Sequence, residues 1–233
     1  MNKSLVIKGI ALSVLASFVA TTAVAADYAK YKSRVGITNV NPKSNNGTIA
    51  VGILPGEPTG LSTDVQDDTM LTFNGVYMLT ENIGIELLAA LPFDHDIEAS
   101  GAVLGALGEI GSTKQLPPTL SAQYYFTNDS AFTPYVGLGI NYTLFFQEEL
   151  TSGAAGLLTA QLGATVNTND ISLADSVGFA YQVGVDYDLN ENMLINLDVR
   201  KMDIDTDVKI IGVDVGEVNI DPTVISLNFG YKY

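Results

Sequence analysis

His95, the only histidine of this 233-residue chain, is the residue most open to a catalytic or metal-binding interpretation. It stands between Asp94 and Asp96. Neighbouring side chains on an extended chain point in opposite directions, so this triplet is a weak metal site, and a solvated position at the base of a loop is the simpler interpretation. Hydrolysis needs a nucleophile, a base and an orienting group that converge. Because the chain has no cysteine, a triad would have to use His95, and an enzyme that modifies lipid A or phospholipids stays an alternative.

Two groups of carboxylates could attract calcium: Asp64 with Asp67 and Asp68, and the acidic run 202–207. Neither has the glycine and the final glutamate at the spacing of a calcium-binding loop. Hydrated carboxylates on alternating strand positions are the ordinary interpretation. A second hypothesis is that divalent ions join these loops to lipopolysaccharide phosphates. We therefore expect no catalytic residue, no resident metal and no cofactor.

The first 26 residues predict a signal peptide that is cleaved after export. Lys3 and Lys8 precede or interrupt a short apolar run, and small residues at 23–26 supply a cleavage site. A retained membrane anchor is the alternative, but the apolar run is short for that role. Residues 27–233 then form one domain of the size that a single barrel reaches, and no linker divides them.

The chain is acidic and yet apolar on average. Its net charge is −15, which becomes −17 without Lys3 and Lys8, and its mean hydropathy is +0.24. Such a surface repels phosphate backbones, so nucleic acid is not an expected partner. No later stretch has the roughly 18 uninterrupted apolar residues of a spanning helix. Alternation along strands is the remaining way to place so many apolar side chains.

Apolar residues recur at every second position in about eight segments of roughly ten residues, the length of a strand that crosses a bilayer at a tilt. The clearest segment is 177–189, where large apolar residues alternate with small or polar ones. The other segments are 34–40, 70–79, 83–91, 119–126, 135–144, 193–200 and 223–233.

The connections between these segments alternate in length. Three are short (80–82, 127–133 and 190–192), and four are long (41–69, 92–116, 147–176 and 201–222). Short turns on one side and long loops on the other are typical of outer-membrane barrels. The sequence therefore predicts an all-β fold, an eight-stranded antiparallel up-and-down transmembrane β-barrel in the outer membrane. A secreted soluble ligand-binding barrel is the alternative, and it would reverse which parity faces inward.

A barrel must pair its last strand with its first, because every backbone group within hydrocarbon needs a partner. The outward residues Phe229, Tyr231 and Tyr233 of the final strand suit the membrane interface. Other tyrosines expected in the interfacial belts are 28, 31, 124, 142, 181 and 187. Tyr125 and Tyr135 lie on the polar parity and are expected inside.

Residues 150–165 depart from period two. Leu150, Ala154, Leu157, Leu158 and Leu162 fit a helical stripe, so a short helix that packs over the barrel mouth is expected in the third long connection.

Several long stretches, in the right order, are similar to the OmpW family of small outer-membrane barrels. They are N-I-G-I-E-L-L-A-A-L-P-F-D-H-D-I (82–97), L-P-P-T-L-S-A-Q-Y-Y-F (116–126), P-Y-V-G-L-G-I-N-Y-T-L-F-F (134–146), Q-V-G-V-D-Y (182–187) and M-D-I-D-T (202–206). The resemblance implies a narrow, largely apolar interior that admits small hydrophobic compounds and releases them sideways into the membrane. It also implies that the barrel-assembly machinery reads the closing strand with its terminal aromatic, here Tyr233 where Phe is usual.

The resemblance also locates a constriction. The Leu and Trp that narrow the family's channel align with Leu88 and Arg200, both on the interior parity. A buried Arg200 needs a partner, and Glu86 and Asp198 are the candidates. A polar plug or charged constriction would then replace an apolar gate. The other residues predicted to line the lumen are Thr72, Asn74, Gln123, Gln182, Asp186, Asn196 and Asn228.

The main functional hypothesis is a channel for the passive passage of small, mostly hydrophobic solutes. The expected partners are outer-membrane lipid, lipopolysaccharide, the assembly machinery during insertion, and the solutes themselves. A closed structural barrel is the alternative, with extracellular loops that serve adhesion, envelope integrity or reception of phages and toxins.

Overall fold

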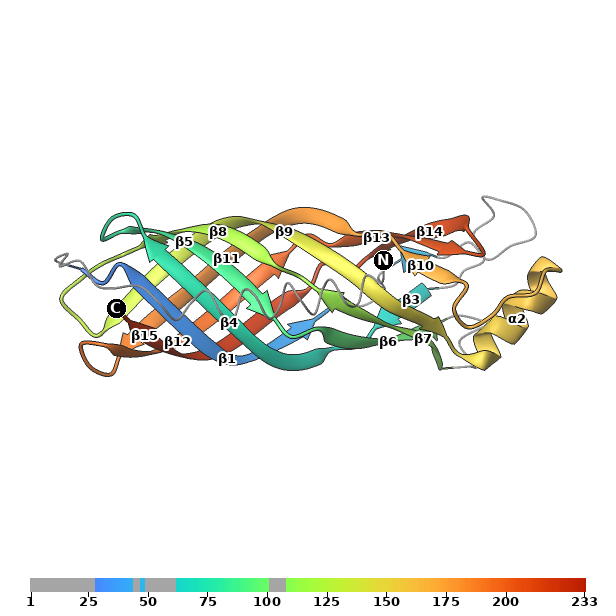
Figure 1. Cartoon of the computed structure of the whole chain (residues 1–233), viewed down its shortest axis with the longest axis horizontal. Helices are drawn as coiled ribbons and strands as arrows, with labels where there is room; N and C mark the ends of the chain where they lie inside the picture. Colours follow the sequence, from blue (N-terminus) through green and yellow to red (C-terminus); the bar gives the residue numbers. More distant parts are fainter. Residues whose placement is uncertain (1–27, 44–46, 49–61, 101–107) are drawn as a thin grey trace.

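Eight antiparallel strands form a closed barrel (Figure 1), which confirms the predicted fold class. The computed structural model describes residues 28–43, 47–48, 62–100 and 108–233, so the predicted signal peptide lies outside the described residues. In order around the barrel, the strands are β1 (Tyr31–Asn41), β4 (Asp68–Met78), β5 (Ile83–Ala90), β8 (Thr119–Tyr125), β9 (Phe132–Leu150), β11 (Ser176–Asp188), β12 (Met193–Met202) and β15 (Thr223–Lys232).

The last strand closes the barrel against the first. β15 pairs with β1 along its whole length, with Val35 opposite Phe229 and Ile37 opposite Leu227. The other edges of these two strands pair with β4 and β12. Each strand of the barrel therefore has a partner on both sides, as a bilayer requires.

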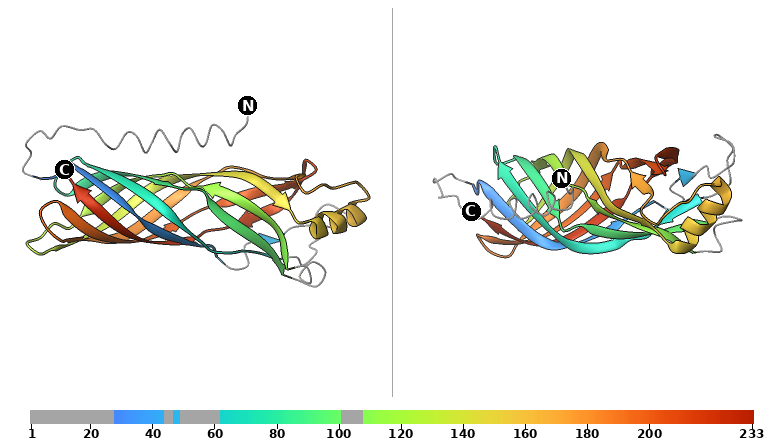
Figure 2. Two further views of the ribbon diagram at one scale, coloured as in Figure 1. Left: turned by 60° about the horizontal axis from the view of Figure 1, so that its bottom comes forward. Right: turned by 45° about the vertical axis from the view of Figure 1, so that its right-hand side comes forward.

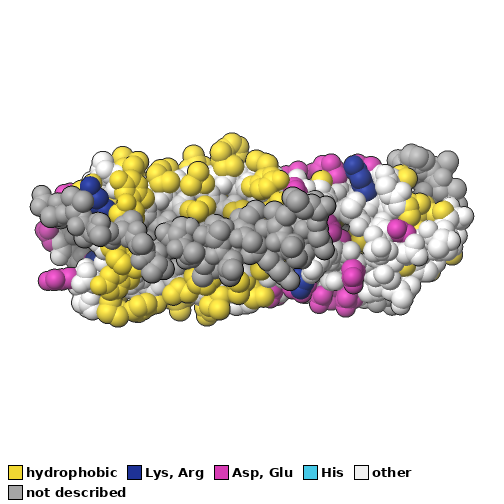
Figure 3. All heavy atoms as spheres, in the orientation of Figure 1, with side chains coloured by type: hydrophobic (Ala, Val, Ile, Leu, Met, Phe, Trp, Pro, Cys, Tyr) yellow, Lys and Arg dark blue, Asp and Glu magenta, His cyan; other side chains and the backbone are white. Residues whose placement is uncertain are grey.

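The outer wall is apolar where the strands cross the membrane. Leu138, Ile140, Phe179 and Val183 each leave more than half of their surface exposed. Figure 3 shows apolar side chains gathered over the barrel half of the molecule, with acidic side chains beyond them. Because a dissolved protein would bury these residues, this wall faces lipid.

Aromatic pairs ring the end of the barrel that carries the short turns. Their ring centroids lie about 5 Å apart: 5.1 Å for Tyr31–Tyr77, 5.2 Å for Tyr124–Phe126, 4.7 Å for Phe132–Tyr187 and 4.8 Å for Tyr231–Tyr233. Phe229 on the same strand as Tyr231 is also half-exposed. That these rings form a belt at a membrane interface stays a prediction.

Tyr28 does not belong to that belt. Its ring is partly buried against Val76, Met78 and the interior tyrosines, and its hydroxyl donates to the Leu79 carbonyl at 3.2 Å. The prediction for this residue was wrong, because Tyr28 precedes β1 and is not bound by the alternation of a strand.

Where the structure describes them, the four long connections contain strands. They extend the barrel as a second sheet in the order β10-β13-β14-β2-β3-β6-β7-β9, and β9 belongs to both parts. The added strands are β2 (Gly47–Thr48), β3 (Ser62–Val65), β6 (Phe93–Ser100), β7 (Glu109–Leu116), β10 (Ile171–Leu173), β13 (Asp205–Ile210) and β14 (Val213–Asn219). Barrels of this class keep short turns in the periplasm, so this extension is extracellular (Figures 1 and 2).

The helix α2 (Ser152–Leu162) lies at the far end of the extension. Thr151 caps its first turn by accepting from the Ala154 amide, and Gly163 ends it in the left-handed conformation at φ 64°. Leu150, expected at its start, belongs to β9 instead. The buried side of the helix carries Ala154, Ala155 and Leu158. No helix within the described ranges has the length and apolar character needed to span a membrane.

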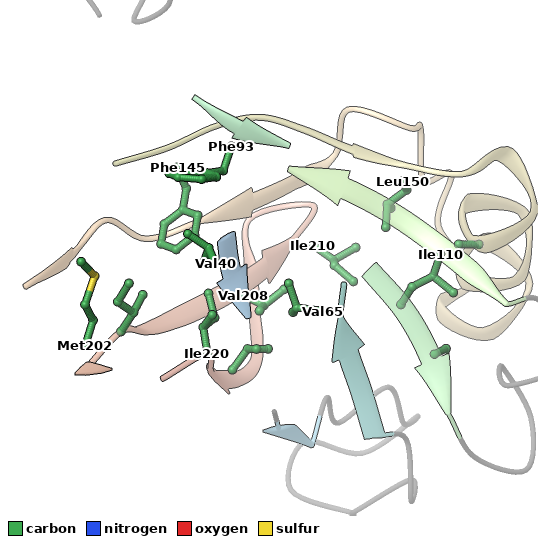
Figure 4. Close-up of a cluster of buried hydrophobic side chains, with 14 of the residues drawn as sticks. Val40, Val65, Phe93, Ile110, Phe145, Leu150, Met202, Val208, Ile210 and Ile220 are labelled. Carbon is green, nitrogen blue, oxygen red and sulfur yellow. The ribbon is translucent and has the colours of Figure 1, made fainter. Parts of the chain in front are cut away.

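The molecule has two different interiors. Polar and charged side chains fill the barrel, whereas aliphatic and aromatic ones fill its upper end and the extension. Figure 4 shows the apolar cluster, from Met202 and Phe145 nearer the barrel to Leu150 and Ile110 nearer the helix. The site of interest is the junction of these interiors.

Candidate functional site

Arg200 and its partners form the centre of the polar interior. The guanidinium donates to the Glu86 carboxylate at 2.7 Å and to the Gln182 side-chain oxygen, and its Nε lies 3.4 Å from Asp198. Glu86 and Asp198 were the partners expected from the sequence. All four side chains are almost fully buried. A guanidinium with several oxygen partners can stay ionised in such surroundings.

A second arginine extends this network toward the short-turn end. Arg34 donates to both carboxylate oxygens of Asp186 at 2.8 Å and to the Tyr125 hydroxyl at 3.0 Å. It also lies 3.7 Å from Glu86, which joins the two groups. Lys32 reaches Asp186 at 3.0 Å and lies 3.8 Å from the centre of the Tyr125 ring. Neither Arg34 nor Lys32 was proposed from the sequence.

The network is balanced in charge and cross-linked by neutral groups. Three cations (Lys32, Arg34 and Arg200) face three carboxylates (Glu86, Asp186 and Asp198). The Tyr135 hydroxyl donates to Asp198 at 2.7 Å, and Asn196 donates to Tyr135 and Asp186 at 3.0 and 2.9 Å. These side chains, together with the Tyr125 ring, form what we call the ionic core.

Gly184 makes room for this arrangement. A Cβ atom at Gly184 would overlap the Tyr135 ring, which passes over Gly184 along the inner wall from β9 to reach Asp198 on β12. The inward glycine and the inward tyrosine face each other across the β9–β11 pair.

The remaining residues predicted to line the lumen all have buried side chains inside the barrel. Gln123 accepts from the Tyr125 hydroxyl at 2.6 Å, and Asn228 donates to Asn196 at 2.9 Å. The buried positions are Thr72, Asn74, Gln123, Gln182, Asp186, Asn196 and Asn228.

Leu88 marks the boundary between the two interiors. It lies one inward position beyond Glu86 on β5, but it belongs to the apolar cluster rather than to the ionic core. Beyond it come Ala90 and Phe93, also buried in that cluster. The predicted pair Leu88 and Arg200 therefore contacts two different environments.

An apolar pocket opens within the extension. It encloses about 800 Å³ of space free of atoms, its open mouth included. The apolar side chains that line the pocket include Ile110 of β7, Leu150 of β9, Leu158 of α2, and Val208 and Ile210 of β13. His95, Thr113, Gln115 and Thr206 are its polar lining residues. The mostly apolar lining suits contact with a hydrophobic molecule.

His95 is buried in this pocket's wall, so the prediction of a solvated loop position was wrong. It lies on β6, with 1% of its surface exposed, while Asp94 and Asp96 point outward. Its Nδ1 lies 2.7 Å from the Gln66 carbonyl, and its Nε2 lies 2.7 Å from Gln115 Nε2. Burial lowers the pKa of His95 below its ordinary value of 6.5, although the Gln66 carbonyl and nearby aspartates act in the opposite direction.

The barrel wall is interrupted beside the pocket. β5 pairs with β8 as far as Leu88 opposite Thr119, and β6 pairs with β7 from Phe93 opposite Gln115. Between them, segments 89–92 and 116–118, both fully described, share no backbone hydrogen bond. Pro92, Pro117 and Pro118 supply no amide hydrogen there. We call this interruption the ladder gap. It lies between the Leu88–Thr119 pair on the barrel side and the Phe93–Gln115 pair on the extracellular side.

The pocket and the ladder gap were missed at the sequence level. Phe93, His95 and Ile97 alternate with Asp94, Asp96 and Glu98, which is a strand signal. That alternation could have placed His95 on an inner face. Nothing local, however, indicates that Gln115, twenty residues later, lies beside it.

The acidic residues considered for calcium do not converge. Asp67 accepts from Asn39 at 3.0 Å, and Asp68 accepts from the Asp94 amide at 2.8 Å. The run 202–207 crosses from β12 into β13 with alternate residues buried. Asp67 and Asp68 make hydrogen bonds at strand ends, and the exposed carboxylates of the run lie on the outer face, where water can solvate them.

The chain matches one protein family along its whole barrel. The sequence profile of the OmpW family matches residues 29–233. Outer membrane protein W of Escherichia coli is 39% identical over 235 residues, covering 99% of this chain and all of the relative. Outer membrane protein W of Vibrio cholerae is 37% identical over 226 residues, covering 95% of this chain and 97% of the relative.

A solved structure agrees with the sequence matches. The crystal structure of the outer membrane protein OprG from Pseudomonas aeruginosa is 36% identical, with a TM-score of 0.73, and the alignment covers 88% of this chain and 96% of that one. The relatives are described as outer-membrane proteins and not as enzymes, in agreement with the non-enzymatic role and the outer-membrane location expected for this chain. The chain belongs to the OmpW family of outer-membrane β-barrel proteins.

Proposed function

We propose that this protein carries small hydrophobic solutes across the outer leaflet, from the extracellular pocket through the ladder gap into the bilayer. The observation that carries the proposal is the position of the gap between an apolar pocket and the ionic core. A hydrophobic solute gains nothing by entering a region of buried ion pairs, because it would have to separate them. Lipid beside the gap offers it an apolar exit.

The ionic core then acts as the charged constriction suggested by Arg200. The ion pairs of Arg200 with Glu86 and Asp198 occupy the barrel interior on the short-turn side of Leu88. They join side chains from different strands there. An axial channel for hydrophobic solutes would require this network to part. The sideways route leaves it in place.

A paired measurement tests the two routes. The uptake of N-phenylnaphthylamine, a small apolar fluorophore, is followed in Gram-negative cells with and without the protein, and ion conductance is measured in planar bilayers. Wild type is expected to raise uptake while it conducts ions weakly. Arg200→Met is expected to raise conductance and to leave uptake unchanged.

The ladder gap has its own variant. Ala90→Trp adds bulk on the inner side of the gap, where Ala90 is buried, and uptake is expected to fall toward that of cells lacking the protein. Val183→Trp, on the lipid-facing side of β11, is the control and keeps uptake. Uptake that does not depend on the protein would reject the proposal in favour of the closed structural barrel with receptor loops.

Two partners stay predictions. The assembly machinery is expected to read β15 with Tyr233, and lipopolysaccharide is expected to surround the extracellular rim. Slower insertion of Tyr233→Ala than of Tyr233→Phe would support the first. Thermal stability that chelators leave unchanged would count against divalent bridges in the second.

A further inference from the structure

The pocket in the extension has one unsatisfied polar atom. Among its lining side chains, which the structure describes, only Gln115 has a buried oxygen or nitrogen without a hydrogen-bond partner, and that atom is Oε1. Only 1% of the Gln115 surface is exposed. The hydroxyl groups of Thr113 and Thr206 donate to the backbone carbonyls of Lys114 and Ala174 instead.

A chain of hydrogen bonds fixes the orientation of the Gln115 amide. The Gln66 carbonyl can only accept, so His95 Nδ1, 2.7 Å away, carries a proton. Neutral His95 then has an acceptor at Nε2, and Gln115 must donate to it through its own Nε2 at 2.7 Å. Gln115 Oε1 is left as a buried acceptor without a partner, on a residue that lines the pocket.

A buried acceptor without a partner is unfavourable unless a ligand supplies a donor. The rest of the pocket, along Ile110, Leu158 and Val208, offers apolar contact only. A pocket of this kind recognises an apolar body by its shape and one polar group by direction.

We propose that the pocket binds compact apolar molecules that carry one hydrogen-bond donor, such as an alcohol or a phenol, with the hydroxyl donating to Gln115 Oε1. This inference rests on the proposed function and narrows its solute class. His95 acts as a positioning residue, because it holds the Gln115 amide and needs no contact with the solute.

The test compares three ligands of one shape in nanodiscs that hold the full-length protein. Naphthalene has no polar group, 2-naphthol donates, and 2-methoxynaphthalene only accepts. Binding is measured by calorimetry and corrected with protein-free nanodiscs. Wild type is expected to bind 2-naphthol about 10-fold more tightly than either of the others, the size of one satisfied buried hydrogen bond.

Gln115→Leu is expected to bind all three ligands equally and to keep its affinity for naphthalene. Gln123→Leu, another buried amide that lies outside the pocket, is the control and keeps the preference. If Gln115→Leu fails to fold, the wild-type comparison of 2-naphthol with its methyl ether still decides. Equal affinity for these two ligands, or a preference that survives in Gln115→Leu, overturns the inference.

The outcome stays separate from the proposed function. Cells that take up N-phenylnaphthylamine through a protein showing no donor preference would retain the function and lose this inference. A donor preference in a protein without uptake would do the reverse.

Discussion

Arg200 illustrates how a charged residue can occupy the centre of a narrow barrel. It shares Glu86 with Arg34, and Asp198 has a second partner in the Tyr135 hydroxyl. Burying a pair of opposite charges costs free energy, but leaving one buried charge without its partner costs more. Removing one member should therefore matter more than removing a matched pair.

Arg200→Met is expected to lower the free energy of unfolding by about 3–5 kcal/mol, because Glu86 and Asp198 lose a cation in a dry interior. Arg200→Met combined with Glu86→Gln should lose less than the sum of the two single variants. Urea unfolding in lipid vesicles measures both. Additive losses would show that the residues are not energetically coupled.

His95 predicts a pH dependence of solute binding. Below its lowered pKa, and hence below 6.5, His95 gains a proton at Nε2 and becomes a donor there. Gln115 must then turn its Oε1 toward His95, which leaves its amide nitrogen where Oε1 had been. 2-Naphthol and 2-methoxynaphthalene can both accept from that nitrogen, so the preference of the pocket for 2-naphthol over its methyl ether disappears. The neighbouring carboxylates of Asp67, Asp68 and Asp94 favour the proton, and burial opposes it. Calorimetry across pH 4–8 follows this change, and a preference constant over that range would contradict it.

An interior residue could be predicted where the alternation of inward and outward positions along its strand was enough to assign its facing. Tyr125 and Tyr135 are fully buried, as expected from their place among polar residues. Lys32 was missed because the first strand was expected to begin at Arg34, whereas β1 begins at Tyr31. Arg34 lay within the expected strand, but no facing was assigned to its side chain. Partner choice across the lumen depends on the barrel's stagger, which no single strand encodes.

At the level of elements, the extracellular connections were the largest error. Charge on one parity and apolar residues on the other, as in β13, are as regular as in the barrel itself. These strands are short, and their pairing is interrupted by register shifts between Ile97 and Glu98, between Val208 and Lys209, and between Ser112 and Lys114. Such segments resemble loops when they are read one at a time. The extension becomes visible only when the hairpins pair with one another.

Helix α2 depends on its cap. Thr151→Ala removes the side-chain acceptor of the Ala154 amide and is expected to cost about 1 kcal/mol locally, or roughly fivefold in amide protection across the helix. Hydrogen exchange measured by mass spectrometry reports this change. Thr159→Ala, within the same helix, serves for comparison. Equal protection in wild type and Thr151→Ala would mean that packing of Leu158, and not the cap, holds the helix.

At the scale of the whole molecule, the excess of acidic residues lies outside the barrel interior. The chain has 26 acidic and 11 basic residues, whereas the ionic core holds three of each. The apolar band of Figure 3 separates acidic side chains at the two ends of the molecule. This division fits a barrel that spans lipid and has water at both ends.

The lipid-facing wall can be tested with one substitution at two heights. Leu138→Arg, on the outer face of β9, is expected to destabilise the barrel by about 2–4 kcal/mol in vesicles, because arginine would face hydrocarbon. Val213→Arg, equally exposed but on β14 of the extension, should change stability by less than about 0.5 kcal/mol. Similar losses at both positions would place the membrane elsewhere on the molecule.

The balance of charge in the ionic core bears on what each further copy does to the envelope. A lumen whose fixed charges cancel draws in neither cations nor anions, since no net field focuses either kind. Any ion that passes such a barrel is therefore not selected by the sign of its charge. Every additional copy in the envelope would leave the balance between cation and anion passage unchanged.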